Sequence, residues 1–289
     1  MESKLAVMCE LCCSLLQAIV IKCFRALSVA FLSLVDGLSM RGTPADEVTT
    51  FDQLASRWWN LDGPMMLLHK FNDLRVPLVV EGLISAGKMD RKQRFKTDAL
   101  EGLKILDVGC AGGIYTEALA KLHATVVGID PAQHLIEVAK AHAATQPELK
   151  DRCHYFVESM EQHAAGDNSA KYDVVVLSET IEHVVDKSEL LKDIASVLKP
   201  GGSVFITTWS KQWWGWLLAI LVLERIMRLL PRGTHDYSKF ISQEDAEAML
   251  EGYNCRTVER RAYYLKFWEN EWTWVPFNNF AYTLHAIKE

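Results

Sequence analysis

One stretch constrains the fold of this chain more than any other. The apolar run Lys104–Val108 leads into a glycine-rich turn at 109–113, and a second apolar run ends at Asp130. The acid follows the first glycine by roughly 20 residues, which in an open α/β sheet places it where ribose hydroxyls bind. The pattern predicts a site for an adenosine-type ligand. The alternative is a tight strand-to-helix turn that binds nothing.

The acid at Asp107 distinguishes between two such ligands. A dinucleotide site normally reads G-x-G-x-x-G and holds pyrophosphate at a helix N-terminus. This chain instead reads D-x-G-x-x-x-G from Asp107 onward. A carboxylate beside the turn repels pyrophosphate but attracts the ammonium group of an amino acid. The spacing therefore favours S-adenosylmethionine over a nicotinamide dinucleotide.

Three later segments predict the rest of an α/β sheet. Residues 172–177 form a continuous β-branched run typical of a buried strand. The next segment, 190–198, has helical spacing and is stopped by the sequence KPGG, after which 203–208 predicts another strand. A chain of 289 residues is long enough for one large core of this kind.

The order of these segments resembles the class I S-adenosylmethionine-dependent methyltransferases, in which LDVGC and LKPGG recur around an acid that ends the second strand. Further motifs narrow the resemblance: ASRWWNLDG, PMMLLHKFNDLR, SETIEHV and PRGTHDYSKFI. From about Phe51 to Ala286 they follow the order found in the ubiquinone-biosynthesis O-methyltransferases. The chain is therefore identified as similar to that family.

The resemblance implies a Rossmann-like, doubly wound sheet of seven strands with an N-terminal helical cap. It also implies an enzyme that methylates phenolic hydroxyls of polyprenylated catechol and quinol intermediates of ubiquinone. Within the cap, Trp58 and Trp59 either pack against other cap residues or have a role in the active site.

Five residues are expected to bind S-adenosylmethionine. Asp107 follows from the charge argument above, and four others match positions that contact the cofactor in the family: Arg75, Gly109, Asp130 and Ser178. The chain departs from the family at Ala111, where a third glycine is usual. Because alanine disfavours a positive φ, we expect an ordinary backbone conformation at this position.

Glu179, Glu182 and His183 match the metal-binding motif E-x-x-E-H of the family. If the chain turns helical directly after the fourth strand, the three side chains share one face and suit Mg²⁺ or a similar divalent cation. Such a cation would help the acceptor hydroxyl lose its proton. The same residues also occur in methyltransferases that use no metal. In that case His183 becomes the general base.

The first 45 residues stand apart from the catalytic domain, which is expected to span 46–289. They are apolar with few acids, and Lys22 and Arg25 interrupt the run that would otherwise span a membrane. An organellar transit segment, a membrane anchor and a secretory signal all remain open.

An insertion at 210–242 is expected to cover the substrate. Its segment 213–223 is apolar, begins with tryptophans and precedes several arginines. Eleven residues are too few to span a bilayer, but such a helix suits a membrane interface. A buried cap helix or a dimer contact is the alternative.

The family resemblance and the composition of the N-terminal segment together imply a peripheral protein on the matrix side of the mitochondrial inner membrane. The resemblance also implies a multi-protein ubiquinone-biosynthesis complex as a partner. A formal net charge of −6 argues against a nucleic-acid partner. Two rival functions stay open: methylation of another lipophilic acceptor, and a non-catalytic scaffold of a membrane biosynthetic complex.

Overall fold

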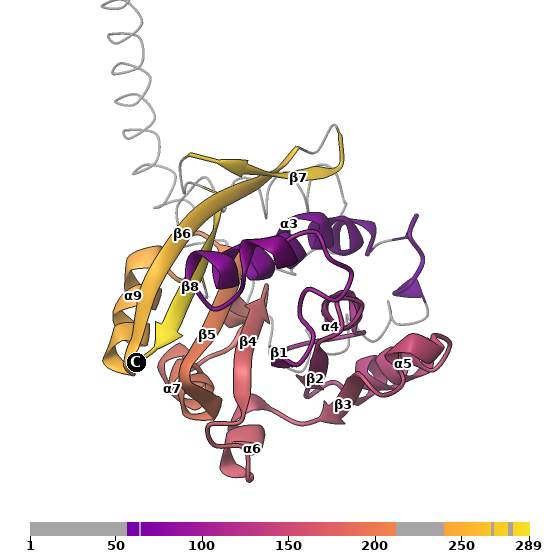
Figure 1. Ribbon diagram of the computed structural model, residues 1–289, viewed down its shortest axis with the longest axis horizontal. Coiled ribbons are helices and arrows are strands. Elements are labelled where there is room, and N and C mark those ends of the chain that lie inside the picture. The colour runs from indigo at the N-terminus through magenta and orange to yellow at the C-terminus, as the bar shows by residue number, and fades with distance from the viewer. Residues whose placement is uncertain (1–56, 64, 212–239, 267–268, 277–279) are drawn as a thin grey trace, which may run out of the picture. The chain divides into compact units, whose positions relative to one another are not determined.

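The computed structural model describes residues 57–63, 65–211, 240–266, 269–276 and 280–289, all within one compact unit. Its centre is an eight-stranded sheet with the order β3-β2-β1-β4-β5-β8-β6-β7 (Figure 1). The strands are β1 (Lys104–Val108), β2 (Thr125–Asp130), β3 (Cys153–Val157), β4 (Tyr172–Ser178), β5 (Leu198–Trp209), β6 (Cys255–Lys266), β7 (Glu271–Val275) and β8 (Ala281–Lys288).

Strands β1 to β5 pair in parallel, whereas β8 runs antiparallel to both β5 and β6. The chain lays β2 and β3 on one side of β1 and then crosses to place β4 on the other. Ligands of open α/β sheets bind at such a switch point, beyond the carboxyl ends of the strands. The expected α/β fold is therefore confirmed.

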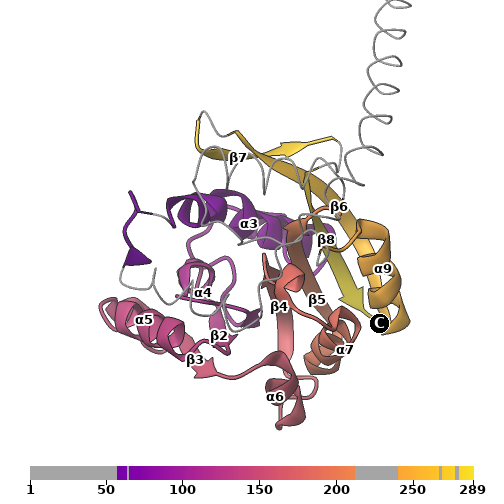
Figure 2. The same cartoon turned by 180° about the vertical axis from the view of Figure 1, so that it is seen from behind.

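Helices cover both faces of the sheet (Figures 1 and 2). They are α3 (Met66–Ser85), α4 (Ile114–Ala120), α5 (Gln133–Ala143), α6 (Met160–Ala165), α7 (Lys187–Val197) and α9 (Gln243–Gly252). Several begin at side-chain caps: Ser159 and Gln162 form a capping box at α6, and Asp186 caps α7. These caps satisfy backbone N–H groups that have no partner within the helix.

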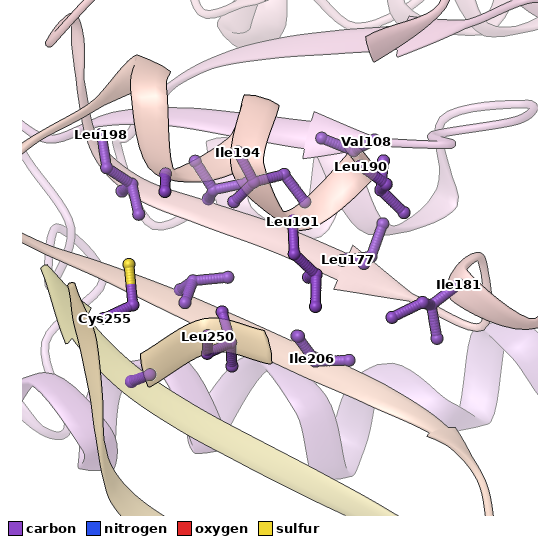
Figure 3. Packing of buried hydrophobic residues seen from close by; sticks show 14 of the residues in the cluster. Val108, Leu177, Ile181, Leu190, Leu191, Ile194, Leu198, Ile206, Leu250 and Cys255 are labelled. Carbon is purple, nitrogen blue, oxygen red and sulfur yellow. The ribbon is translucent and has the colours of Figure 1, made fainter. Parts of the chain in front are cut away.

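Neighbouring residues of a strand enter different cores, because successive side chains point to opposite faces. In β1, Ile105 packs with α3 and α4, while Leu106 packs with α6, α7 and α9. Figure 3 shows part of the second core, where Leu191 and Ile194 of α7 lie over the strands. The continuous apolar runs of the sequence are explained by burial on both faces.

Two details differ from the sequence-based expectation. Helix α7 begins at Lys187 and ends at Val197, and the KPGG segment already belongs to β5. The described sheet also has one strand more than the seven expected. The additional edge strand β7 pairs only with β6, as an antiparallel partner.

Two predicted regions fall outside the described residues: the N-terminal segment 1–45 and most of the insertion 210–242. Within the described part of the chain, none of the helices has the length and apolar character needed to cross a bilayer.

Candidate active site

A cavity of about 800 Å³ opens at the carboxyl ends of β1, β2 and β4. It gathers all five residues expected to bind the cofactor, together with two of the three expected metal ligands. These lining residues are Arg75, Asp107, Gly109, Asp130, Ser178, Glu179 and His183. Positions separated by more than a hundred residues thus meet in one cavity.

The glycine turn forms the floor of this cavity. Gly109 and Gly113 adopt left-handed backbone angles, with φ of 71° and 86°. At Gly112 a side chain has no room, because an added Cβ would lie 2.3 Å from Cδ1 of Trp58. The cap residue Trp58 therefore rests directly on the turn and lines the cavity.

The expectation for Ala111 was wrong, since its φ is 47°. The left-handed conformation costs an L-residue roughly 1–2 kcal/mol. A hydrogen bond of 3.0 Å from the Ala111 N–H to Oδ2 of Asp130 holds the turn in this shape. A backbone geometry that glycine adopts without steric cost is therefore imposed here on alanine.

Asp130 links the turn to the second strand. Its Oδ1 accepts a 2.8 Å hydrogen bond from the N–H of Ala132, while its Oδ2 accepts the bond from Ala111. Burial raises the pKa of this carboxyl, and the two backbone hydrogen bonds oppose that rise. A carboxylate oxygen accepts more than one bond, so a ribose hydroxyl remains a suitable further donor.

Asp107 lies deeper, with 2% of its surface exposed. Its Oδ2 accepts a 2.6 Å hydrogen bond from Oγ1 of Thr116. Burial raises the pKa of Asp107 to about 6, against the opposing effects of Thr116 and the nearby Arg75. The group therefore changes charge close to neutral pH.

Arg75 joins α3 to the end of β4. Its Nε donates to Oδ1 of Asn72 at 2.8 Å, and one terminal nitrogen donates to Oγ of Ser178 at 2.9 Å. The guanidinium also lies 4.1 Å from the ring centre of Tyr115. These contacts compensate a buried charge.

Glu179 occupies a strained backbone position, with φ of 52°. Its Oε1 accepts a 2.6 Å hydrogen bond from the hydroxyl of Tyr263. Burial raises the pKa of Glu179, while Tyr263 and Arg75 oppose the rise. Sequence reasoning missed Tyr263, because nothing in strand β6 marks it as a partner of a residue so far away.

The three expected metal ligands do not share one face. Only the short 3₁₀ helix Ile181–His183 follows β4, after the left-handed Glu179. Glu182 is 2% exposed and accepts a 2.8 Å hydrogen bond from Oγ1 of Thr208, and it does not line the cavity. Across the described ranges, histidine, cysteine and acidic side chains nowhere gather in threes around a possible cation position. The side-chain arrangement does not fit the predicted Mg²⁺ site.

The other tryptophan of the cap does not line the cavity. Trp59 stacks on the imidazole of His142 with ring centres 3.4 Å apart, and its Nε1 donates to the carbonyl of Gly112. His142 in turn bonds the buried carboxylate of Glu117 at 2.8 Å. Trp59 therefore packs the cap against α5, whereas Trp58 lines the cavity.

Comparison with known proteins identifies the family of this chain. A profile described as a methyltransferase domain matches residues 84–260. The ubiquinone biosynthesis O-methyltransferase of rat mitochondria is 39% identical over 84% of this chain, which spans 69% of that protein. The human counterpart is 40% identical, and the chain spans 64% of it. The Bartonella bacilliformis enzyme of the same name is 41% identical, over 74% of this chain and 83% of the relative.

Solved structures agree on the fold. Magnesium protoporphyrin IX methyltransferase of Synechocystis PCC 6803, with bound S-adenosylmethionine, superposes with a TM-score of 0.53 at 15% identity, covering 84% of this chain and 98% of that one. A Burkholderia thailandensis N1-methyltransferase superposes equally well at 11% identity, covering 86% and 91%. The profile and the relatives together show that this chain belongs to the ubiquinone biosynthesis O-methyltransferase family, within the S-adenosylmethionine-dependent methyltransferases.

Proposed function

We propose that this protein transfers the methyl group of S-adenosylmethionine to a phenolic hydroxyl of a polyprenylated catechol or quinol in ubiquinone biosynthesis. The observation that carries the proposal is one cavity, whose lining we divide into two halves by the elements that contribute the side chains. One half contains the glycine turn and the carboxylates of β1 and β2. The other half, beyond β4 and β5, is lined by apolar and aromatic side chains: Leu67, Phe71, Trp209 and Trp272.

The first half suits the cofactor. Asp130 and Asp107 both line the cavity. We assign Asp130 to the ribose hydroxyls and Asp107 to the methionine ammonium. Gly109, Arg75 and Ser178 complete this half of the cavity. A cofactor held there would leave the second half of the cavity to an apolar aromatic acceptor, which its sulfonium methyl would face.

The transfer needs no covalent enzyme intermediate. The acceptor oxygen attacks the methyl carbon in line with the carbon–sulfur bond, an O–C bond forms, and the C–S electrons return to sulfur as S-adenosylhomocysteine leaves. The phenolic proton passes to His183, which lines the same cavity. Imidazole is the side chain that most often serves as a general base near neutral pH.

Magnesium assistance remains a prediction from the family motif. Glu182 bonds Thr208 and lies outside the cavity lining, so the proposed proton transfer uses His183 and no metal ion. Glu179 would instead orient the acceptor, fixed by its bond to Tyr263.

We further propose a mitochondrial location, at the matrix face of the inner membrane. The mammalian relatives are named as mitochondrial, and a polyprenylated acceptor resides in a membrane. The apolar segment 213–223 would provide peripheral contact, and a ubiquinone-biosynthesis complex would be the protein partner. Carbonate extraction of isolated mitochondria tests this proposal: a peripheral protein is released, and an embedded one stays in the pellet.

The central experiment measures methyl transfer from labelled S-adenosylmethionine to a short-chain prenylated catechol acid, with and without EDTA, and identifies the product by mass. O-methylation that survives EDTA supports the proposed route through His183. Activity that is lost with EDTA and restored by Mg²⁺ restores the metal prediction. Cofactor binding without transfer to this acceptor refutes the proposed acceptor class, and no cofactor binding favours the scaffold reading.

A further inference from the structure

Strand β7 brings a tryptophan to the acceptor half of the cavity. Among the described strands, β7 pairs only with β6, and this hairpin lies beside α3 in both views (Figures 1 and 2). Trp272 on β7 lines the cavity, as Leu67 and Phe71 of α3 do. The hairpin therefore adds a wall to the site.

The indole of Trp272 is held in one orientation. Its Nε1 donates a 2.9 Å hydrogen bond to the carbonyl of Leu67 on α3. Its ring packs against Phe71 at 4.7 Å between centroids and against Tyr263 at 5.8 Å. The hydrogen bond and the ring contacts fix the indole before a ligand binds. Stacking of a ligand on this ring would therefore cost little side-chain entropy.

The side chains around Trp272 favour an apolar, aromatic acceptor. Leu67 and Phe71 from α3 and Trp209 from β5 form the neighbouring wall. An aromatic acceptor would gain binding free energy here from the burial of its apolar surface and from the offset or edge-to-face geometry that aromatic pairs prefer.

We propose that Trp272 is the platform on which the aromatic ring of the methyl acceptor stacks, so that the β6–β7 hairpin determines acceptor specificity. This inference rests on the proposed function and deepens it. Trp272 acts on acceptor binding, and the cofactor half of the cavity is independent of it.

The same strand offers a matched control. Trp274 lies two residues further along β7, on the same face of the sheet. The guanidinium of Arg261 lies 5.3 Å from its ring centre, and the ring of Tyr263 meets it edge to face at 6.4 Å. Trp274 does not line the cavity. Trp274→Ala thus removes an equal side chain from the same hairpin without touching the proposed platform.

The test measures two binding constants by calorimetry: S-adenosylhomocysteine to the free protein, and a short-chain prenylated catechol acid to the protein saturated with S-adenosylhomocysteine. Trp272→Leu keeps apolar bulk but removes the ring, and should weaken acceptor binding at least about tenfold while cofactor binding stays within about twofold. Trp272→Phe should recover most of the acceptor affinity. Trp274→Ala should leave both constants unchanged.

Three results would overturn the inference: no binding of the aromatic acceptor to the wild-type protein, unchanged acceptor binding in Trp272→Leu, or an equal loss in Trp274→Ala. Binding is read without turnover, so it separates this inference from the proposed function. A wild-type protein that binds the acceptor through Trp272 but does not methylate it refutes the function alone.

Discussion

The buried carboxyl of Asp107 makes a sharp prediction about cofactor affinity. We expect S-adenosylmethionine to bind more weakly as the pH falls from 7 to 5. In the proposed site the ammonium of the cofactor would pair with the ionised form of Asp107, and burial raises the pKa of this group to about 6. The cofactor ammonium itself stays charged throughout this range.

The magnitude follows from the fraction of ionised Asp107. With a pKa of about 6, roughly nine tenths of the carboxyl is ionised at pH 7 and about one tenth at pH 5. If binding requires the ionised form, the dissociation constant should rise about tenfold across the range, which corresponds to about 1.4 kcal/mol.

Calorimetric titration at several pH values measures this change, and circular dichroism checks that the protein stays folded. Thr116→Val provides the directional control. Its hydroxyl donates to the carboxylate and lowers the pKa of Asp107, so its removal should raise the pKa and shift the midpoint to higher pH. Asp107→Asn should bind S-adenosylmethionine weakly at every pH, without the tenfold change in the dissociation constant. The reasoning is refuted if the dissociation constant of the wild-type protein does not change between pH 7 and 5, or if Asp107→Asn keeps the pH dependence of the wild type.

Three further outcomes are expected. Ala111→Gly should raise the free energy of unfolding by up to about 1 kcal/mol in thermal melts, because glycine relieves the left-handed φ; a lower melting temperature would contradict this. Arg75→Met should lower stability in urea by about 2–3 kcal/mol and weaken cofactor binding, since it removes the charge that bonds Ser178; an unchanged unfolding midpoint would count against it. Gly112→Ala should weaken cofactor binding at least about tenfold by displacing Trp58, and calorimetry that finds wild-type affinity would exclude that role for the contact.

Much of the cofactor half could be predicted from the chain alone. Gly109, Asp107 and Asp130 lie at the ends of strands whose periodicity and turn residues are local features. Parallel strands place their carboxyl ends at one edge, so residues at those ends converge without any knowledge of side-chain packing. Ala111 was the exception, because its φ depends on the hydrogen bond to Asp130 across the sheet.

Only the tertiary structure determines which side chains line the acceptor half of the cavity. Glu182 follows the expected motif yet bonds Thr208, because a left-handed Glu179 and a single 3₁₀ turn replace the expected helix. Tyr263 and Trp272 reach the site only because β6 and β7 form a hairpin that packs on α3. Local periodicity thus determined the sheet, the glycine turn and the acids at the strand ends. The partners of those acids and the aromatic wall depend on contacts between distant segments, which no local pattern specifies.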